Sequence, residues 1–422
     1  MERRPDQPGA PGDKGGVAGL MALARTGALC AELERCLPER PFEVEFWDGR
    51  RLPATRGTGV PRFRVRSPQA VVHALRAPGQ LGIARAYVSG QLEVDDLDAA
   101  IRLLDSWEPP PLRLADRARL ALSAARACGV GPLPSPPLME LAPRGRRHSR
   151  ERDARAVRHH YDVPAEFFAL FLDRSMTYSC AIFSRGAQTL EEAQETKLEL
   201  VCTKLGLEPG QRVLDVGCGW GSFAVHAPSR HRVHVTGITL SGPQALVARR
   251  RVGEAGLAQH IDIRVMDYRQ LADVRFDAIA SIGMVEHVGA ANIDPYARRL
   301  AGLLRPGGRL LNHGIARLRH GDPEAGPFSQ RYVFPDAAPL HLSRVIAALE
   351  GAGLETTHVE GFRHDYAETL RHWARRLDDS LEQSIKLAGP ERVRVWRLYL
   401  RAARNGFETG FTSVYQTLCT RR

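Results

Sequence analysis

The chain has 422 residues, enough for two or three domains with a sizeable core, and 43% of its residues are hydrophobic. The sequence contains no apolar run of transmembrane length, and its seven cysteines form no CxxC pair, so neither a membrane-spanning helix nor a zinc or disulfide framework is predicted. The formal net charge of +11 indicates an anionic partner such as a phospholipid surface, a nucleic acid or an acidic ligand, unless it reflects only compositional drift toward arginine.

The N-terminal part of the chain predicts three segments. Residues 1–18 are rich in Pro, Gly and charge, which is typical of a disordered tail. Residues 19–108 combine apolar helical stretches with short strand patterns and predict a small α+β accessory domain. Residues 109–150 predict a helix followed by a connecting segment rich in Pro, Gly and Arg. Residues 144–158 contain seven arginines and only two acidic residues, which indicates either a solvated helix or linker or a contact with anionic lipid headgroups.

Residues 151–422 predict a second domain, in which strand and helix patterns alternate. Such alternation predicts an α/β fold with a mostly parallel sheet and helices on both faces. A long helical stretch, residues 363–406, is expected as an insertion before a last strand at residues 411–417. The earlier strands are expected at residues 213–216, 234–238, 261–265 and 276–282 and from residue 309 onward.

One glycine-rich stretch, Gln211–Ser222 (QRVLDVGCGWGS), organises this second domain. A short apolar strand ends with Asp215, which is unusual for a buried strand, and three glycines follow before Ser222 begins a helix pattern. Glycines at this point allow a tight turn and close approach of a ligand to the backbone. The Gly-x-Gly-x-Gly spacing is neither a dinucleotide fingerprint nor a phosphate loop. The stretch therefore predicts a nucleotide-type site, with an ordinary strand-to-helix turn as the alternative.

Polar residues follow every strand of the predicted sheet. Because the carboxyl ends of parallel strands meet at one edge, these residues are expected to surround one crevice. A surface-loop role is the alternative for each residue taken singly. They are the Gly217–Gly221 loop, Thr239, Ser241, Gln244, Asp267, Tyr268, Glu286, His287 and His313.

These segments resemble the cyclopropane fatty acid synthase family, which includes the mycolic acid cyclopropane synthases and falls among the class I S-adenosylmethionine-dependent methyltransferases. Two N-terminal segments, RFRVRSPQAV and ARAYVSGQLEV, are similar to the accessory domain of its bacterial lipid-acting members. The resemblance implies a Rossmann-like class I methyltransferase sheet. The segments that carry it are HYDVPAEFFALFLDRSMTYSCAIF, LDVGCGWGSF, GITLS, SIGMVEHVG, LNHGI, RYVFPD and HDYAETLRHW.

The resemblance also implies roles for individual residues. Asp267 would accept a hydrogen bond from the adenine amino group. The residues implied to bind S-adenosylmethionine are Tyr178, Ser179, Asp215, Gly217, Gly219, Gly221, Ser222, Thr239, Ser241, Gln244, Asp267 and Tyr268. The residues that match the family's bicarbonate-binding positions, and so form the implied catalytic set, are Cys180, Glu286, His313, Ile315 and Tyr366.

The implied activity is that of a cyclopropane-fatty-acyl-phospholipid synthase with bicarbonate as general base. Ala403 stands where many relatives have a cysteine, so a covalent mechanism through that position is not expected. The alternatives are a fatty-acyl methyltransferase that makes methylene- or methyl-branched chains, a nucleic-acid or small-molecule methyltransferase, and a non-catalytic lipid-binding protein. The segment Gly283–Glu286 lacks the Asn/Asp-Pro-Pro-Tyr/Phe pattern of base amino-group methylation, which disfavours nucleic acid.

The expected partner is an unsaturated phospholipid in an anionic membrane surface, with no nucleic acid. The odd cysteine count fits a reducing compartment, so we expect a cytoplasmic protein peripheral to the inner face of the membrane. A homodimer, the acyl chain length, the double-bond position and the headgroup preference are left open.

Overall fold

The computed structural model describes residues 26–129, 133–141, 152, 163–321 and 326–422. The expected tail at residues 1–18 and nearly all of the arginine-rich stretch at 144–158 lie outside these residues. The chain forms two compact units, Met1–Pro137 and Leu138–Arg422, which are described separately below.

The first unit is an α+β domain built on a four-stranded sheet with the order β2-β1-β3-β4. β1 pairs parallel with β3, whereas the β1–β2 and β3–β4 pairs are antiparallel. β2 and β4 were not predicted, because strands of two or three residues carry too little periodicity. The strands are β1 (Glu43–Glu45), β2 (Arg51–Leu52), β3 (Arg62–Val65) and β4 (Leu92–Val94). The helices are α2 (Gly27–Cys36), α3 (Pro68–Arg76), α4 (Gln80–Val88), α5 (Leu97–Ser106) and α6 (Leu114–Cys128).

Helix α6 belongs to this first unit, although the sequence analysis placed it in the connecting segment. Its Ala124 and Ala127 are buried in the same core as Leu29 and Ala70, and the helix packs against α2 and α3. Small alanine side chains allow this close packing but give a weak amphipathic pattern, so the burial was not visible in the sequence.

The second unit contains a seven-stranded sheet with the order β10-β11-β9-β8-β5-β6-β7. β5, the first of its strands in the sequence, pairs with both β6 and β8. These two pairings, and those of β6 with β7 and of β8 with β9, are parallel. β11 is antiparallel to both β9 and β10. The predicted mostly parallel sheet is therefore confirmed. The strands are β5 (Arg212–Val216), β6 (His234–Thr239), β7 (Ile261–Val265), β8 (Phe276–Ile282), β9 (Leu304–Arg317), β10 (Leu354–Gly361) and β11 (Thr412–Arg421).

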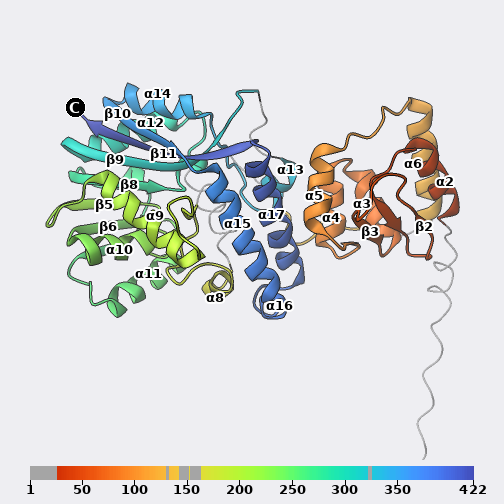
Figure 1. Cartoon of the computed structure of the whole chain (residues 1–422), viewed down its shortest axis with the longest axis horizontal. Coiled ribbons are helices and arrows are strands. Elements are labelled where there is room, and N and C mark those ends of the chain that lie inside the picture. The colour runs from red at the N-terminus through yellow and green to blue at the C-terminus, as the bar shows by residue number, and fades with distance from the viewer. Residues whose placement is uncertain (1–25, 130–132, 142–151, 153–162, 322–325) are drawn as a thin grey trace, which may run out of the picture. The chain divides into compact units, whose positions relative to one another are not determined.

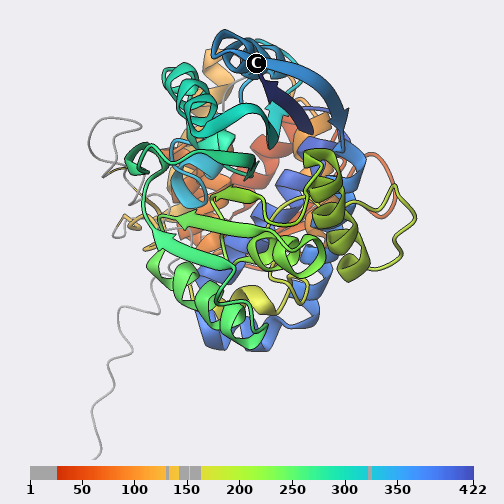
Figure 2. The same ribbon diagram turned by 90° about the vertical axis from the view of Figure 1, so that its left-hand side faces the viewer.

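Helices cover both faces of this sheet (Figures 1 and 2). Alternate strand residues point to opposite faces: Val213 and Leu311 pack with one set of helices, whereas Leu214 and Leu310 pack with the other. The first set is α9 (Leu190–Leu205), α10 (Ser222–His231) and α11 (Gly242–Glu254). The second set is α12 (Ile293–Leu303) and α14 (Leu342–Gly351).

The predicted helical insertion lies between β10 and β11. Its helices are α15 (Arg363–Asp379), α16 (Leu381–Ala388) and α17 (Pro390–Glu408). Together with α8 (Ala165–Ala169), they enclose a buried aromatic cluster that contains Phe167, Phe168, Phe171, Trp373 and Trp396. Within the part of the chain that the structure describes, no helix is both long and apolar enough to cross a membrane.

Candidate functional site

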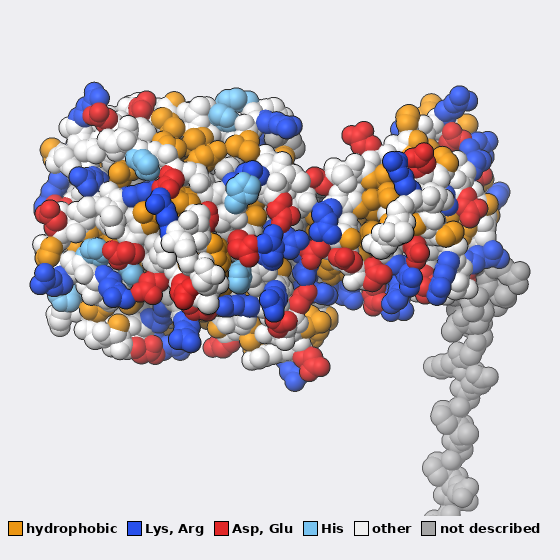
Figure 3. All heavy atoms as spheres, viewed as in Figure 1, with side chains coloured by type: hydrophobic (Ala, Val, Ile, Leu, Met, Phe, Trp, Pro, Cys, Tyr) orange, Lys and Arg blue, Asp and Glu red, His pale blue; other side chains and the backbone are white. Residues whose placement is uncertain are grey.

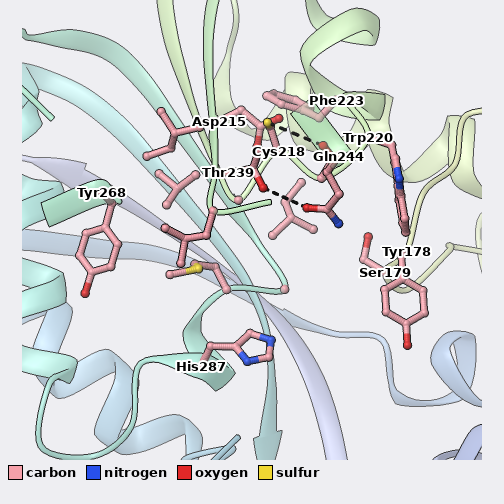
Figure 4. A pocket seen from close by; sticks show the side chains of 18 of the residues that line it. Tyr178, Ser179, Asp215, Cys218, Trp220, Phe223, Thr239, Gln244, Tyr268 and His287 are labelled. Carbon is pink, nitrogen blue, oxygen red and sulfur yellow. Dashed lines mark hydrogen bonds between the residues drawn. The ribbon is translucent and has the colours of Figure 1, made fainter. Parts of the chain in front are cut away.

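A pocket opens at the carboxyl ends of β5, β6 and β8 (Figure 4). The order of the strands reverses at β5, and such a reversal leaves a crevice in which open α/β sheets bind their ligands. Tyr268, which begins the short helix η1 (Tyr268–Gln270), lies on one side of the pocket, and Tyr178 and Trp220 lie on the opposite side. The pocket therefore occupies the place that the strand-end residues predicted.

Most of the residues predicted to bind S-adenosylmethionine line this pocket. They are Tyr178, Ser179, Asp215, Gly217, Gly219, Ser222, Thr239, Gln244, Asp267 and Tyr268. Gly221 and Ser241 are not among its lining residues. A Cβ atom at Gly221 would lie 3.1 Å from the Ala248 side chain, so this glycine allows α10 and α11 to approach each other. The Ser241 side chain caps α11 by accepting a hydrogen bond from the Gln244 N–H at 3.3 Å.

The glycine loop is held against β6. The N–H groups of Gly217 and Cys218 both donate to the Ile238 carbonyl at 2.9 Å. Gly219 has a φ of +54°, and a Cβ atom built there would meet no other atom within 4 Å. The loop thus presents bare backbone to the pocket at the position where the sequence predicted close contact with a ligand.

Two buried ionisable side chains, Lys197 and Asp215, line the pocket, and the sequence analysis missed Lys197. Lys197 of α9 is only 1% exposed, and its Nζ atom donates to the Ser179 hydroxyl at 3.0 Å. Burial lowers the pKa of Lys197 to about 8, although Asp173, Cys180 and Asp215 oppose this shift. Burial raises the pKa of Asp215 to about 7, against the influence of Lys197. Asp215 Oδ2 has no hydrogen-bond partner among the described residues.

These two side chains give the pocket an ammonium and a carboxyl group. A buried charge is stable only when it is paired and hydrogen-bonded, and Lys197 and Asp215 are each incompletely matched. A ligand with both an ammonium and a carboxylate group would satisfy them. Sequence reasoning missed Lys197 because one lysine on an amphipathic helix ordinarily faces solvent; the available signal was its position among the apolar residues of α9.

Neighbouring side chains fix the Thr177–Ser179 segment. The Gln194 amide donates to the carbonyls of Ser179 at 2.9 Å and Thr177 at 3.3 Å. The Asp173 carboxylate accepts hydrogen bonds from the N–H groups of Ser175 at 2.7 Å and Thr177 at 2.8 Å. These contacts hold Tyr178 and Ser179 at the pocket, and Gln194 is a second functional side chain that the sequence did not reveal.

Thr239, Gln244 and Asp267 also line the pocket. The Thr239 hydroxyl donates to Gln244 Oε1 at 2.9 Å. Asp267, predicted as the adenine acceptor, already accepts two hydrogen bonds from the Arg269 guanidinium, at 2.8 and 2.5 Å. Asp267 Oδ1 also accepts from the Arg269 backbone N–H at 2.9 Å.

The five residues predicted to bind bicarbonate do not line the pocket. We group them as the buried polar cluster, in which Cys180, Glu286 and His313 are buried and Ile315 and Tyr366 are partly buried. Glu286, in the short helix η2 (Val285–His287), accepts a hydrogen bond through Oε1 from the Ile315 N–H at 2.6 Å. His313 and Ile315 lie on the same face of β9, because side chains alternate along a strand. The remaining two residues meet at the Phe362 carbonyl, which lies 3.7 Å from Cys180 Sγ and accepts from the Tyr366 N–H at 3.0 Å.

The two halves of this cluster are joined through the sheet. Val414 of β11 lies opposite Ile315 of β9, and its carbonyl accepts from the Phe362 N–H at 2.9 Å. Ile315 matches a bicarbonate-binding position of the family, and its N–H group donates to Glu286 here. Backbone contacts of β9, β11 and Phe362 therefore link the predicted residues.

The cluster has unused hydrogen-bonding atoms. Burial raises the pKa of Glu286 to about 7, opposed by the Ile315 N–H. Burial lowers the pKa of His313 to about 3, and Lys197 and Lys204 reinforce the effect, so the ring is neutral. Burial also raises the pKa of the Cys180 thiol far above its usual value. Glu286 Oε2 and His313 Nε2 are both buried and lack hydrogen-bond partners in the described part of the chain. A small hydroxylated anion would fit such a set of thiol, imidazole and carboxyl groups.

Comparisons with known proteins match most of the chain. A family model described as mycolic acid cyclopropane synthetase matches residues 148–417. A probable fatty acid methyltransferase of Mycobacterium tuberculosis is 40% identical over 394 residues, which cover 91% of this chain and 92% of the relative. The cyclopropane-fatty-acyl-phospholipid synthase of Escherichia coli K12 is 31% identical over 369 residues, with coverages of 87% and 90%. The solved structure of the mycolic acid cyclopropane synthase CmaA1 with SAH and CTAB is 33% identical, has a TM-score of 0.60, and covers 64% of this chain and 98% of that chain.

Proposed function

The chain belongs to the mycolic acid cyclopropane synthetase family of S-adenosylmethionine-dependent methyltransferases, and we propose that its sheet-edge pocket binds S-adenosylmethionine. The bare backbone at Gly219 supports this assignment, as does the Lys197–Asp215 pair, which suits the zwitterionic methionine end of the ligand. The CmaA1 structure, which contains SAH, is a relative with the same fold.

Replacing Lys197 with methionine should weaken S-adenosylmethionine binding roughly tenfold to hundredfold, because a hydrogen bond to a charged group contributes about 1.5–3 kcal/mol. Calorimetry measures the affinity. Methylthioadenosine, which lacks the methionine carboxylate, should bind the variant and the wild type equally well. Lys204→Met is the matched control, since Lys204 lies on the same helix and does not line the pocket. An unchanged S-adenosylmethionine affinity in Lys197→Met would contradict the assignment.

We further propose that the enzyme cyclopropanates the double bond of unsaturated phospholipid acyl chains. The alkene carbon attacks the sulfonium methyl group, the acyl chain becomes a carbocation, and SAH leaves. Loss of a proton from the added methyl group then allows the ring to close. The observation that carries this proposal is the buried polar cluster, in which Glu286 Oε2 and His313 Nε2 lack partners among the described residues.

Bicarbonate, when bound, would supply the general base that removes this proton. The neutral His313 ring and the Cys180 thiol can donate hydrogen bonds to its oxygens, and ionised Glu286 can accept from its hydroxyl. The neighbouring aromatic cluster, which includes the buried Trp373 and Trp396, would exclude the water that otherwise traps a carbocation as an alcohol.

A second candidate is a fatty-acyl methyltransferase that makes methylene- or methyl-branched chains. It is favoured by the relative named a probable fatty acid methyltransferase, which is 40% identical, against 31% for the cyclopropane synthase of Escherichia coli. Both candidates share the methyl transfer and differ in the fate of the carbocation. If a 1,2-hydride shift moves the cation to the carbon that carries the added methyl group, loss of a proton from that methyl group gives a methylene branch, and hydride from a reductant gives a saturated methyl branch.

Mass spectrometry of phospholipid vesicles incubated with enzyme and S-adenosylmethionine separates these products. Cyclopropanation adds one CH2 and leaves no double bond that ozone can cleave. A methylene product adds the same mass but remains cleavable, and a methyl branch made with a reductant carries two further hydrogens. Finding only a cleavable or a saturated branched product would replace the cyclopropanation proposal with the second candidate.

The proposed partner is an unsaturated phospholipid in an anionic membrane surface. On the face seen in Figure 3, Lys and Arg side chains lie beside Asp and Glu over much of the second unit; Arg397 and Arg401, for example, both pair with Asp378. We therefore assign the proposed attraction between the protein and the anionic membrane to the net charge of +11 and to the arginine-rich stretch at residues 144–158. Sedimentation with anionic phospholipid vesicles should show that binding weakens as salt screens these charges.

A further inference from the structure

A chain of polar side chains reaches His313 from the side opposite its unpartnered nitrogen. Gln416 of β11 lies directly across from His313 in the β9–β11 pairing. Its amide nitrogen is 3.2 Å from His313 Nδ1, and its amide oxygen accepts from Lys204 Nζ at 2.7 Å. Lys204 also pairs with Glu360 at 2.5 Å. Gln416 is fully buried, so solvent does not compete for these contacts.

The chemistry of these groups determines which ring nitrogen of His313 carries the proton. An ammonium group can only donate, so the oxygen of the Gln416 amide must face Lys204. The amide NH2 group then faces His313 Nδ1, and it too can only donate. A neutral imidazole that accepts at Nδ1 must carry its proton on Nε2, because the hydrogen bond at one ring nitrogen sets the state of the other.

This tautomer directs a hydrogen-bond donor into the buried polar cluster. Nε2 is buried and has no partner among the described residues. The titratable groups that act on the ring, Lys197 and Lys204, both oppose its protonation. Glu360 lies on the far side of Lys204 and partly compensates its charge. His313 is therefore a neutral donor with one free N–H.

We propose that Gln416 and Lys204 are positioning residues that hold His313 in its Nε2–H tautomer, so that the ring donates a hydrogen bond to the anion bound beside Glu286. This inference rests on the proposed function for the identity of that anion. The tautomer itself depends only on residues of this chain.

Nitrogen NMR of the protein labelled with 15N-histidine tests the tautomer directly, with the His313 signal assigned by its loss in His313→Gln. In the wild type, Nε2 should have the protonated shift and Nδ1 the unprotonated shift. Gln416→Glu keeps the shape and the contact with Lys204 but presents an acceptor to Nδ1, so at alkaline pH the neutral ring should reverse its tautomer. Wild-type protein with the proton on Nδ1, or an unchanged tautomer in Gln416→Glu, would overturn the inference.

Activity provides a second measurement. Loss of the donor should raise the bicarbonate concentration for half-maximal activity roughly tenfold to hundredfold in Gln416→Glu, while S-adenosylmethionine affinity stays unchanged. Gln416→Leu, which fixes neither tautomer, should be less impaired. A purely structural role predicts the reverse order, because glutamate keeps the contact with Lys204 and leucine does not. Lys204→Met, which frees the amide to rotate, repeats the NMR test should Gln416→Glu not fold.

These measurements also separate the inference from the proposed function. A wild-type enzyme that needs no bicarbonate would refute the proposed base, yet the NMR spectrum would still report the tautomer. A bicarbonate-dependent enzyme whose His313 carries its proton on Nδ1 would refute the inference alone.

Discussion

Replacing Glu286 with glutamine is expected to lower the rate of lipid modification roughly a hundred- to ten-thousand-fold, the usual effect of losing a positioned general base, here the bicarbonate that Glu286 would hold. The amide oxygen of the introduced glutamine can still accept from the Ile315 N–H, as Glu286 Oε1 does at 2.6 Å. The amide nitrogen, however, places a donor where the proposed bicarbonate hydroxyl needs an acceptor. Rates measured on phospholipid vesicles should fall, and calorimetry should show unchanged S-adenosylmethionine affinity.

The same substitution should not destabilise the fold at alkaline pH. Burial raises the pKa of Glu286 in the folded protein to about 7, above its ordinary value of 4.5, so the folded state binds this proton more tightly than the unfolded state. The stability it contributes is complete below the unfolded pKa and is lost as the pH rises through about 7. Glutamine stays neutral, so urea unfolding above that pH should find the variant at least as stable as the wild type.

His287→Gln is the matched control for Glu286→Gln. The two residues are adjacent in η2, but His287 lines the sheet-edge pocket, whereas Glu286 belongs to the buried polar cluster. The control should alter S-adenosylmethionine binding more than the bicarbonate dependence. A Glu286→Gln enzyme with near-normal rates, and a wild type indifferent to bicarbonate depletion, would make Glu286 a structural residue.

The fold was largely predictable because its signals are local. β7 and β8 were predicted with the same bounds as in the structure, since apolar runs bounded by turn residues mark buried strands. The glycine loop was predictable for a similar reason: only glycine readily adopts the positive φ angles found at Gly217 and Gly219. Because the ends of parallel strands share one edge, Thr239 and Asp267 were predicted to lie at the same site, and both line the pocket.

The parts that escaped prediction depend on tertiary contacts. Lys197 and Gln416 are polar residues on elements whose sequence patterns suggest solvent exposure, yet both are almost fully buried. Their partners, Ser179 and His313, are distant in the sequence, so no spacing rule links them. The positions of strand ends also placed Glu286 and His287 in one predicted site. Strand ends identify the edge of a sheet, but they do not show which side chain faces the sheet-edge pocket and which belongs to the buried polar cluster.

Replacing Gly219 with valine should abolish measurable S-adenosylmethionine binding while the protein remains folded. Gly219 lines the pocket with a φ of +54°, and an added Cβ atom would meet no protein atom within 4 Å. The branched side chain would therefore project into the space proposed for the ligand. The positive φ should cost about 1–2 kcal/mol of stability, as expected for an L-residue in the left-handed region. Calorimetry measures binding, and circular dichroism with urea unfolding measures the fold.

Gly256→Val separates the backbone strain from the blocked pocket. Gly256 also has a positive φ, +67°, and no atom within 4 Å of its built Cβ, but it lies outside the pocket after α11. Both variants should lose similar stability, and only Gly219→Val should lose the ligand. If Gly219→Val binds S-adenosylmethionine with wild-type affinity, the ligand does not approach the glycine loop and the pocket assignment fails. If both variants lose binding, strain in the fold explains the loss, and Lys197→Met becomes the decisive test of the site.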